Sequence, residues 1–222
     1  MTTRRSARTQ FVLALGLASL VSIAFFAYGA WRNQSWAFNY LVWNLWLAWL
    51  PLLFAFWLVT VLKRKLWSSW EALLASVLWL IFLPNSFYMI SDFIHLQELA
   101  RIDILYDVVM FTSFIYTGVL LGFTSLYLVH LELLKRFSRR VSGGLIAATL
   151  VICSFAIYVG RDLRWNSWDI LTNPGGLLFD VSDRLQHPTV YPQMIITVVS
   201  FSILLGSMYL LVWRGLALFR AH

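Results

Sequence analysis

The stretch that decides the fold reads FVLALGLASLVSIAFFAYGAW, residues 11–31. It has no charged side chain and is long enough to cross a bilayer as a helix, which takes about 20 apolar residues. Similar stretches recur along the chain, and we expect six spans at about residues 11–31, 37–62, 70–90, 106–129, 143–164 and 192–213. Because lipid leaves backbone groups no partner outside their own helix, the sequence predicts an all-α polytopic membrane protein, with residues 1–222 forming a single helical bundle.

The composition agrees with this class of protein. Of the 222 residues, 60% are hydrophobic and only 12% are charged, against about 25% charged in soluble domains. The six spans leave no room for a separate soluble domain. The net charge of +7 is not a nucleic-acid signal, because the basic residues form short clusters between apolar stretches. The single cysteine, Cys153, excludes an intramolecular disulfide and a thiolate metal cage.

The first span has an alternative interpretation as a signal peptide. Arg4, Arg5 and Arg8 precede it, and residues 27–29 (AYG) loosely resemble a cleavage site. The apolar run is longer than the roughly 7 to 15 residues of a signal-peptide core. We therefore favour an uncleaved first helix.

The orientation follows from the basic residues of alternate segments. Twelve Lys and Arg residues fall in the terminal segments and in the connections near residues 63–65 and 135–140, and five fall in the opposite set. The positive-inside rule assigns the richer set to the cytoplasm. We expect a bacterial plasma-membrane protein with both termini cytoplasmic, surrounded by membrane lipids.

Polar residues gather on the other, extracytoplasmic side. Eight of the ten acidic residues map there, all except Glu71 and Glu132. We predict one pocket on this side from the polar residues near the span ends: Asn44, Asn85, Tyr88, Asp92, His95, Asp107, Arg161, Arg164, Asn166 and Asp169.

Four of these residues follow each other at helical spacing. Asn85, Tyr88, Asp92 and His95 are three, four and three residues apart, so a continuous helix places them on one face over about 15 Å. Such a face can transfer a proton or hold a cation. The segment 91–103 alternates apolar and charged residues, as in a helix lying at the membrane interface.

The second long outer connection is residues 171–191. It contains the turn signal NPGG at 173–176, followed by acidic and basic residues. We expect a lid or a short amphipathic element there.

The charged residues Asp107, Arg161 and Arg164 allow two interpretations. A charge within a span normally faces the bundle interior and finds a partner, so Asp107 and Arg161 could form an ion pair between two helices. Alternatively, carboxylates hold one arginine while the other faces a ligand phosphate or carboxylate. The stretch RDLRWNSWD (161–169) is equally typical of an interfacial anchor, with tryptophans among headgroups.

A metal site is the less favoured hypothesis. Asp92 and His95, joined by His187 or Asp107, could form a zinc site with histidine and carboxylate ligands. The sequence has no HExxH motif, and His187 precedes a proline in a connection. No cofactor is indicated by the sequence.

The motifs WNLWLAWLP (43–51), LPN (83–85) with Tyr88, Asp92 and His95, YD (106–107), and GRDLRWNSWD (160–169) resemble a known pattern. The chain is similar over about residues 35–205 to the bacterial multi-pass membrane family called domain of unknown function thirteen sixty-one. The resemblance implies a bacterial membrane protein and assigns no catalytic residue.

From these residues we expect a pocket that binds an anionic lipid or lipid-linked headgroup. If the protein is an enzyme, the pocket would also process this ligand. Arg161 and Arg164 would bind the anion, while Asp92, His95 and Asp107 would act as acid and base or hold a cation. The alternatives are a transporter or flippase with a gated network of Asp107, Arg161 and His95, and a non-enzymatic assembly protein whose polar cluster is structural.

Overall fold

The computed structural model describes residues 2–98, 104–165 and 169–218, and in these ranges every regular element is a helix. The elements in chain order are α1 (Thr2–Asn33), α2 (Asn39–Val61), α3 (Trp70–Tyr88), η1 (Met89–Glu98), α4 (Ile104–Leu134), α5 (Arg139–Asp162), α6 (Asp169–Thr172), α7 (Pro174–Gln186), η2 (Pro188–Val190) and α8 (Pro192–Leu218). Six of the helices are long and apolar enough to cross a membrane. The protein is an all-α polytopic membrane protein, as predicted.

The observed spans are close to the predicted ones, except that the fourth, Ile104–Leu134, ends five residues beyond its predicted end and the third also runs further. That span runs from Trp70 to Leu96, because the chain continues beyond α3 as the 3₁₀ helix η1. The prediction of a separate interfacial helix from residue 91 is therefore wrong over residues 91–96. Its first polar residue, Asp92, is buried against α2, so this turn belongs to the bundle and not to the surface.

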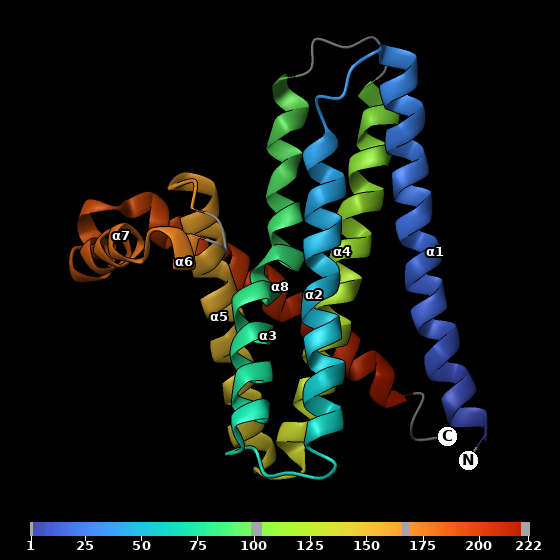
Figure 1. Cartoon of the computed structure of the whole chain (residues 1–222). Helices are drawn as coiled ribbons and strands as arrows, with labels where there is room; N and C mark the ends of the chain where they lie inside the picture. Colours follow the sequence, from blue (N-terminus) through green and yellow to red (C-terminus); the bar gives the residue numbers. More distant parts are fainter. Residues whose placement is uncertain (1, 99–103, 166–168, 219–222) are drawn as a thin grey trace.

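The centre of the bundle is the close packing of α2, α3 and α4, which stand side by side in Figure 1. Small residues allow this approach. The Ser86 hydroxyl donates to the Ala48 carbonyl oxygen at 3.2 Å, which joins α3 to α2. Gly118 and Gly122 of α4 lie against the junction of α3 and η1, where an added Cβ atom would fall within 3 Å of the Met89 side chain of η1 at Gly118 and of the Ser86 and Phe87 side chains of α3 at Gly122.

The first and last helices lie outside this centre. Helix α1 packs on α4, where the Ser22 hydroxyl lies 3.4 Å from the Thr117 hydroxyl, and Trp49 of α2 donates its indole N–H to the Ser19 hydroxyl at 3.1 Å. Helix α8 packs on α5 and crosses the bundle obliquely (Figure 1). The start of α1 and the end of α8 lie toward the end of the bundle that holds the α2–α3 and α4–α5 connections.

The second long connection forms helices rather than an open turn. Asn173 caps α7 by accepting a hydrogen bond from the Gly176 N–H at 3.1 Å, and Pro174 occupies the first helical turn. Asn is a favoured N-cap and Pro fits the start of a helix, so the NPGG signal marks a helix start here. Helix α7 lies across the direction of the bundle helices beside the end of α5 (Figure 1).

Candidate functional site

A cavity of about 590 Å³ opens between α2, α3, η1, α5 and α7. Its two sides differ in chemistry. The polar side is formed by α2, α3 and η1 and contains Tyr40, Asn44, Asn85, Tyr88, Asp92 and His95, and the same helices also contribute the apolar Trp43, Leu47, Ile81 and Pro84. The opposite side is formed by α5 and α7 and is mainly apolar: Ile152, Phe155, Ala156, Val159, Leu177, Leu178 and Val181.

Helical spacing positions the polar side. Asn44 lies one turn after Tyr40 on α2, so both face the cavity. Asn85 and Tyr88 belong to the last turn of α3. In η1, three residues complete a turn, and His95 therefore follows Asp92 on the same side. The change from α-helix to 3₁₀ helix at Met89 thus keeps the line of polar residues on the cavity.

Asp92 is the buried charge-bearing group of this side, with 1% of its surface exposed. The Asn44 side-chain amide donates to Asp92 Oδ2 at 3.1 Å. Arg161 lies close enough to act on the carboxylate electrostatically. A buried carboxylate is stabilised by hydrogen bonds and nearby positive charge, and here Asn44 of α2 supplies the hydrogen bond and Arg161 of α5 the charge.

Arg161 closes the site from the end of α5. Its Nη1 lies 3.1 Å from His95 Nε2. A guanidinium only donates hydrogen bonds, so His95 Nε2 is the acceptor and the imidazole proton resides on Nδ1. The Tyr40 ring packs against the His95 ring at 5.3 Å between centroids. The result is a neutral imidazole whose Nε2 is reserved for an arginine.

Gly160 lets α3 and α5 approach at this point. A Cβ atom there would lie 3.1 Å from Cε2 of the Tyr88 ring. Sequence reasoning did not select Gly160, Tyr40 or Trp43, all of which line the cavity. The available signal was sequence position, because Gly160 precedes Arg161, Trp43 precedes Asn44, and Tyr40 lies one helical turn before Asn44.

The other predicted site residues lie elsewhere. Asp107 is buried near the start of α4 and does not line the cavity. Arg164 is exposed and adopts a left-handed backbone conformation, with φ of 59°. Asp169 begins α6 and accepts a hydrogen bond from Thr172 at 3.2 Å. Asn166 falls outside the described residues. An ion pair between Asp107 and Arg161 stays a prediction.

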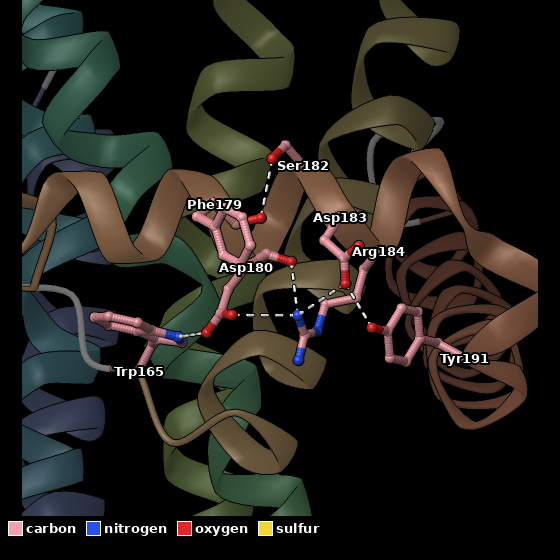
Figure 2. A network of polar contacts seen from close by, with 7 residues as sticks. All are labelled: Trp165, Phe179, Asp180, Ser182, Asp183, Arg184 and Tyr191. Atoms are coloured by element: carbon pink, nitrogen blue, oxygen red, sulfur yellow. Dashed lines mark hydrogen bonds and ion pairs between the residues drawn. The ribbon is translucent and has the colours of Figure 1, made fainter.

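A polar network at α7 also escaped the sequence reasoning, which treated Trp165 as an interfacial anchor. The Trp165 indole N–H donates to Asp180 Oδ2 at 2.8 Å, as Figure 2 shows. Arg184 donates to the Asp180 carboxylate at 3.3 Å and lies 3.7 Å from Asp183. Tyr191 donates to the Asp183 carboxylate. The network ties α7 to the end of α5 and so holds the apolar side of the cavity in place.

Tyr191 links this network to the start of α8. Its hydrogen bond to the Asp183 carboxylate raises the pKa of the phenol, because only the protonated phenol can donate. The stabilisation is therefore present at neutral pH and is lost as the pH rises through that raised value.

The indole bond gives a measurable prediction. Trp165→Phe keeps an aromatic ring and removes only the N–H donor to Asp180. One lost hydrogen bond corresponds to about 1 kcal/mol, so we expect amide protection over residues 174–186 to fall about fivefold in hydrogen–deuterium exchange. Trp36→Phe, at an exposed position, is the control. Unchanged protection in both variants would show that α7 is held by packing alone.

The predicted metal ligands are not gathered at one point. Asp92 and His95 line the cavity, whereas His187 ends α7 and is exposed. Among the residues that the structure describes, no group of three His, Cys, Asp or Glu side chains could hold a metal ion. The side chains that the structure describes at the cavity therefore offer one carboxylate, one neutral imidazole, one arginine, the amides of Asn44 and Asn85, and the phenols of Tyr40 and Tyr88.

The comparisons with known proteins give one family. A family model described as Protein of unknown function (DUF1361) matches residues 43–208, which covers most of the chain. No curated protein and no solved structure matches. The matched range contains every residue that lines the cavity except Tyr40.

Proposed function

We propose a function for this chain, which belongs to the family described as protein of unknown function (DUF1361): its cavity binds a phosphate-bearing lipid or lipid-linked headgroup at the extracytoplasmic side of the membrane. The observation that carries the proposal is the two-sided cavity. A polar side with Asp92 and His95 faces an apolar side from α5 and α7, within about 590 Å³. Such a site suits an amphiphile, and the volume lies in the range of ligand pockets.

The polar side supports a headgroup with an anion and a hydroxyl or amino group. Arg161 is the arginine beside the cavity, and a phosphate is a stronger acceptor for its guanidinium than the neutral His95 ring. When the guanidinium turns to a phosphate, His95 Nε2 becomes available to the ligand. Asp92 can accept a hydrogen bond from a hydroxyl or amino group of the same headgroup.

The apolar side supports a hydrocarbon chain. Leu177 and Leu178 of α7 meet Phe155 and Val159 of α5 there, and Leu178 is largely exposed. A fully hydrophilic ligand would gain nothing from this wall, whereas a lipid chain would cover its apolar surface. The proposal is binding and not turnover, because only Asp92 and His95 of the three predicted acid–base residues line the cavity.

The side of the membrane follows from charge. Among the described residues, eleven of the twelve basic residues of the richer set lie in segments at the opposite end of the bundle, and the positive-inside rule would place that end and both termini in the cytoplasm. The cavity would then face outward, in a bacterial plasma membrane as the family resemblance implies.

The test is to identify lipids that copurify with the protein by mass spectrometry and to measure their binding in nanodiscs. Arg161→Gln removes the anion partner, and we expect at least about tenfold weaker binding of the phosphate-bearing lipid, since a charge-assisted hydrogen bond contributes about 1.5–3 kcal/mol. The matched control is Arg164→Gln, three residues later and exposed. Equal binding by both variants contradicts the proposal. Solute flux in sealed vesicles without lipid binding would favour the transporter instead.

A further inference from the structure

A second cavity, of about 510 Å³, lies between α4, α5 and α8. We name it the α5–α8 groove. One face of α5 and one face of α8 form its sides, and its floor is formed by the end of α4 together with Tyr209 and Trp213 of α8. The lining residues on which the argument depends are His130, Arg139, Gly143, Gly206, Tyr209 and Arg214. None of them lines the first cavity.

The groove exists because α5 and α8 diverge. Tyr158 and Val159 near the end of α5 pack against Met194 at the start of α8. From there α8 runs obliquely away from α5 (Figure 1). The space between the two helices therefore opens toward the end of the bundle with the α4–α5 connection, where the basic residues cluster.

The floor of the groove is an aromatic stack. The His130 ring lies 4.1 Å from the Trp213 ring, at 25°. His130 Nδ1 and the Tyr209 hydroxyl are 3.0 Å apart and share a hydrogen bond. All three side chains are restrained by their neighbours, so the floor is preformed.

Two arginines stand at the groove with no acidic partner. Within residues 2–98, 104–165 and 169–218, neither the Arg139 nor the Arg214 side chain forms an ion pair or a hydrogen bond. Nearby basic residues differ: Lys135 and Arg136 both pair with Glu132. The groove therefore combines an apolar interior with two uncompensated positive charges.

The interior has room for a chain. A Cβ atom added to Gly143 or Gly206 would meet no atom within 4 Å. In the described part of the chain, the buried hydroxyl oxygen of Ser202 has no hydrogen-bond partner. If α5 and α8 packed tightly against each other here, side chains of the facing helix would fill the space beside these two glycines.

We infer that the α5–α8 groove binds one anionic phospholipid, with its phosphate between Arg139 and Arg214 and an acyl chain along Gly143 and Gly206. Basic pockets between membrane helices are the sites at which anionic headgroups bind, and each arginine near the surface contributes about 1 kcal/mol. The two arginines favour a phospholipid over a transmembrane helix of a partner protein. A partner helix would fit beside small residues, but it would leave both guanidinium groups without an anion.

The first arm of the test removes the charge. The probe is dioleoyl phosphatidylglycerol, with dioleoyl phosphatidylcholine as the uncharged-headgroup reference, and native mass spectrometry counts the lipids retained. In Arg139→Gln with Arg214→Gln, we expect retention of phosphatidylglycerol to fall about fivefold for each arginine. The matched control, Arg64→Gln with Arg140→Gln, removes the same charge from the same end outside the groove. Equal effects of both pairs overturn the inference.

The second arm fills the groove. Gly143→Leu and Gly144→Leu are neighbours in α5, and both have open space around the added Cβ, but only Gly143 lines the groove. We expect Gly143→Leu to lose the bound lipid and Gly144→Leu to keep it, with equal folding by size exclusion. If Gly143→Leu instead dissociates a dimer of the protein and leaves lipid retention unchanged, the groove is occupied by a protein helix and the inference fails. Both arms are repeated in the Arg161→Gln background, in which the first cavity has lost its anion partner. Lipid retained at the α5–α8 groove is thereby measured separately from lipid bound at the first cavity.

Discussion

Gly122→Leu is expected to lower the free energy of unfolding by about 3 kcal/mol or more, because it forces α4 away from α3. The ideal Cβ at this position lies 2.8 Å from the Ser86 Cβ and 2.8 Å from Cε1 of Phe87. The Phe87 ring could turn, but the Ser86 Cβ is fixed by its own backbone. The helices themselves must therefore separate.

That separation would also break the contact of α3 with α2. The Ser86 hydroxyl donates to the Ala48 carbonyl oxygen, so a displaced α3 loses this bond and exposes the packing around Leu83. Unfolding in mixed micelles of mild detergent and dodecyl sulfate measures the effect. Gly16→Leu is the control, because nothing lies within 4 Å of its added Cβ. A loss below about 0.5 kcal/mol in Gly122→Leu, as for an ordinary surface change, would show that α3 and α4 tolerate separation.

The second large effect is expected at Asn44. Asn44→Leu keeps the size of the side chain and removes the amide that donates to Asp92 Oδ2 at 3.1 Å. The carboxylate, with 1% of its surface exposed, is then left without that donor. We expect a loss of about 1.5–3 kcal/mol in unfolding free energy, the range for a hydrogen bond to a charged group.

A double-mutant cycle separates structure from function at this pair. Asn44→Leu with Asp92→Leu replaces both groups by apolar ones, and most of the lost stability should return, since a buried polar pair is often replaceable as a whole. The recovered protein should nevertheless bind the lipid more weakly at the cavity, because Asp92 can no longer accept a hydrogen bond from the headgroup. Additive losses in the double variant would show that the two residues do not act as a pair. Restored stability together with full lipid binding would reduce the cluster to a structural role.

The fold was largely predictable from hydrophobicity. Each span is about as long as a bilayer requires, and this constraint acts on one helix at a time. The prediction failed at residues 91–96, because the polar Asp92 and His95 interrupt the apolar run as they would in a surface segment. In the structure these two residues lie inside the bundle, where Asp92 contacts Asn44 of α2 and His95 contacts Arg161 of α5.

The candidate site was predictable only along one helix. The spacing of Asn85, Tyr88, Asp92 and His95 is a local property, and these residues line the same cavity. The selection of Asp107 and Arg164 rested on their side of the membrane alone. Being on the same side does not bring two helices into contact, and neither residue lines the cavity.

The sequence by itself determined the class of protein, its six spans and the polar face of the third, because burial of backbone groups in lipid and helical spacing depend on local chemistry. Only the tertiary structure decided which helices are neighbours. In a membrane, the face of a helix toward lipid is as apolar as the face toward the core, so hydrophobicity does not show which face packs. The pairing of Asn44 with Asp92, the closing of the cavity by α7 and the divergence of α8 from α5 follow from that packing.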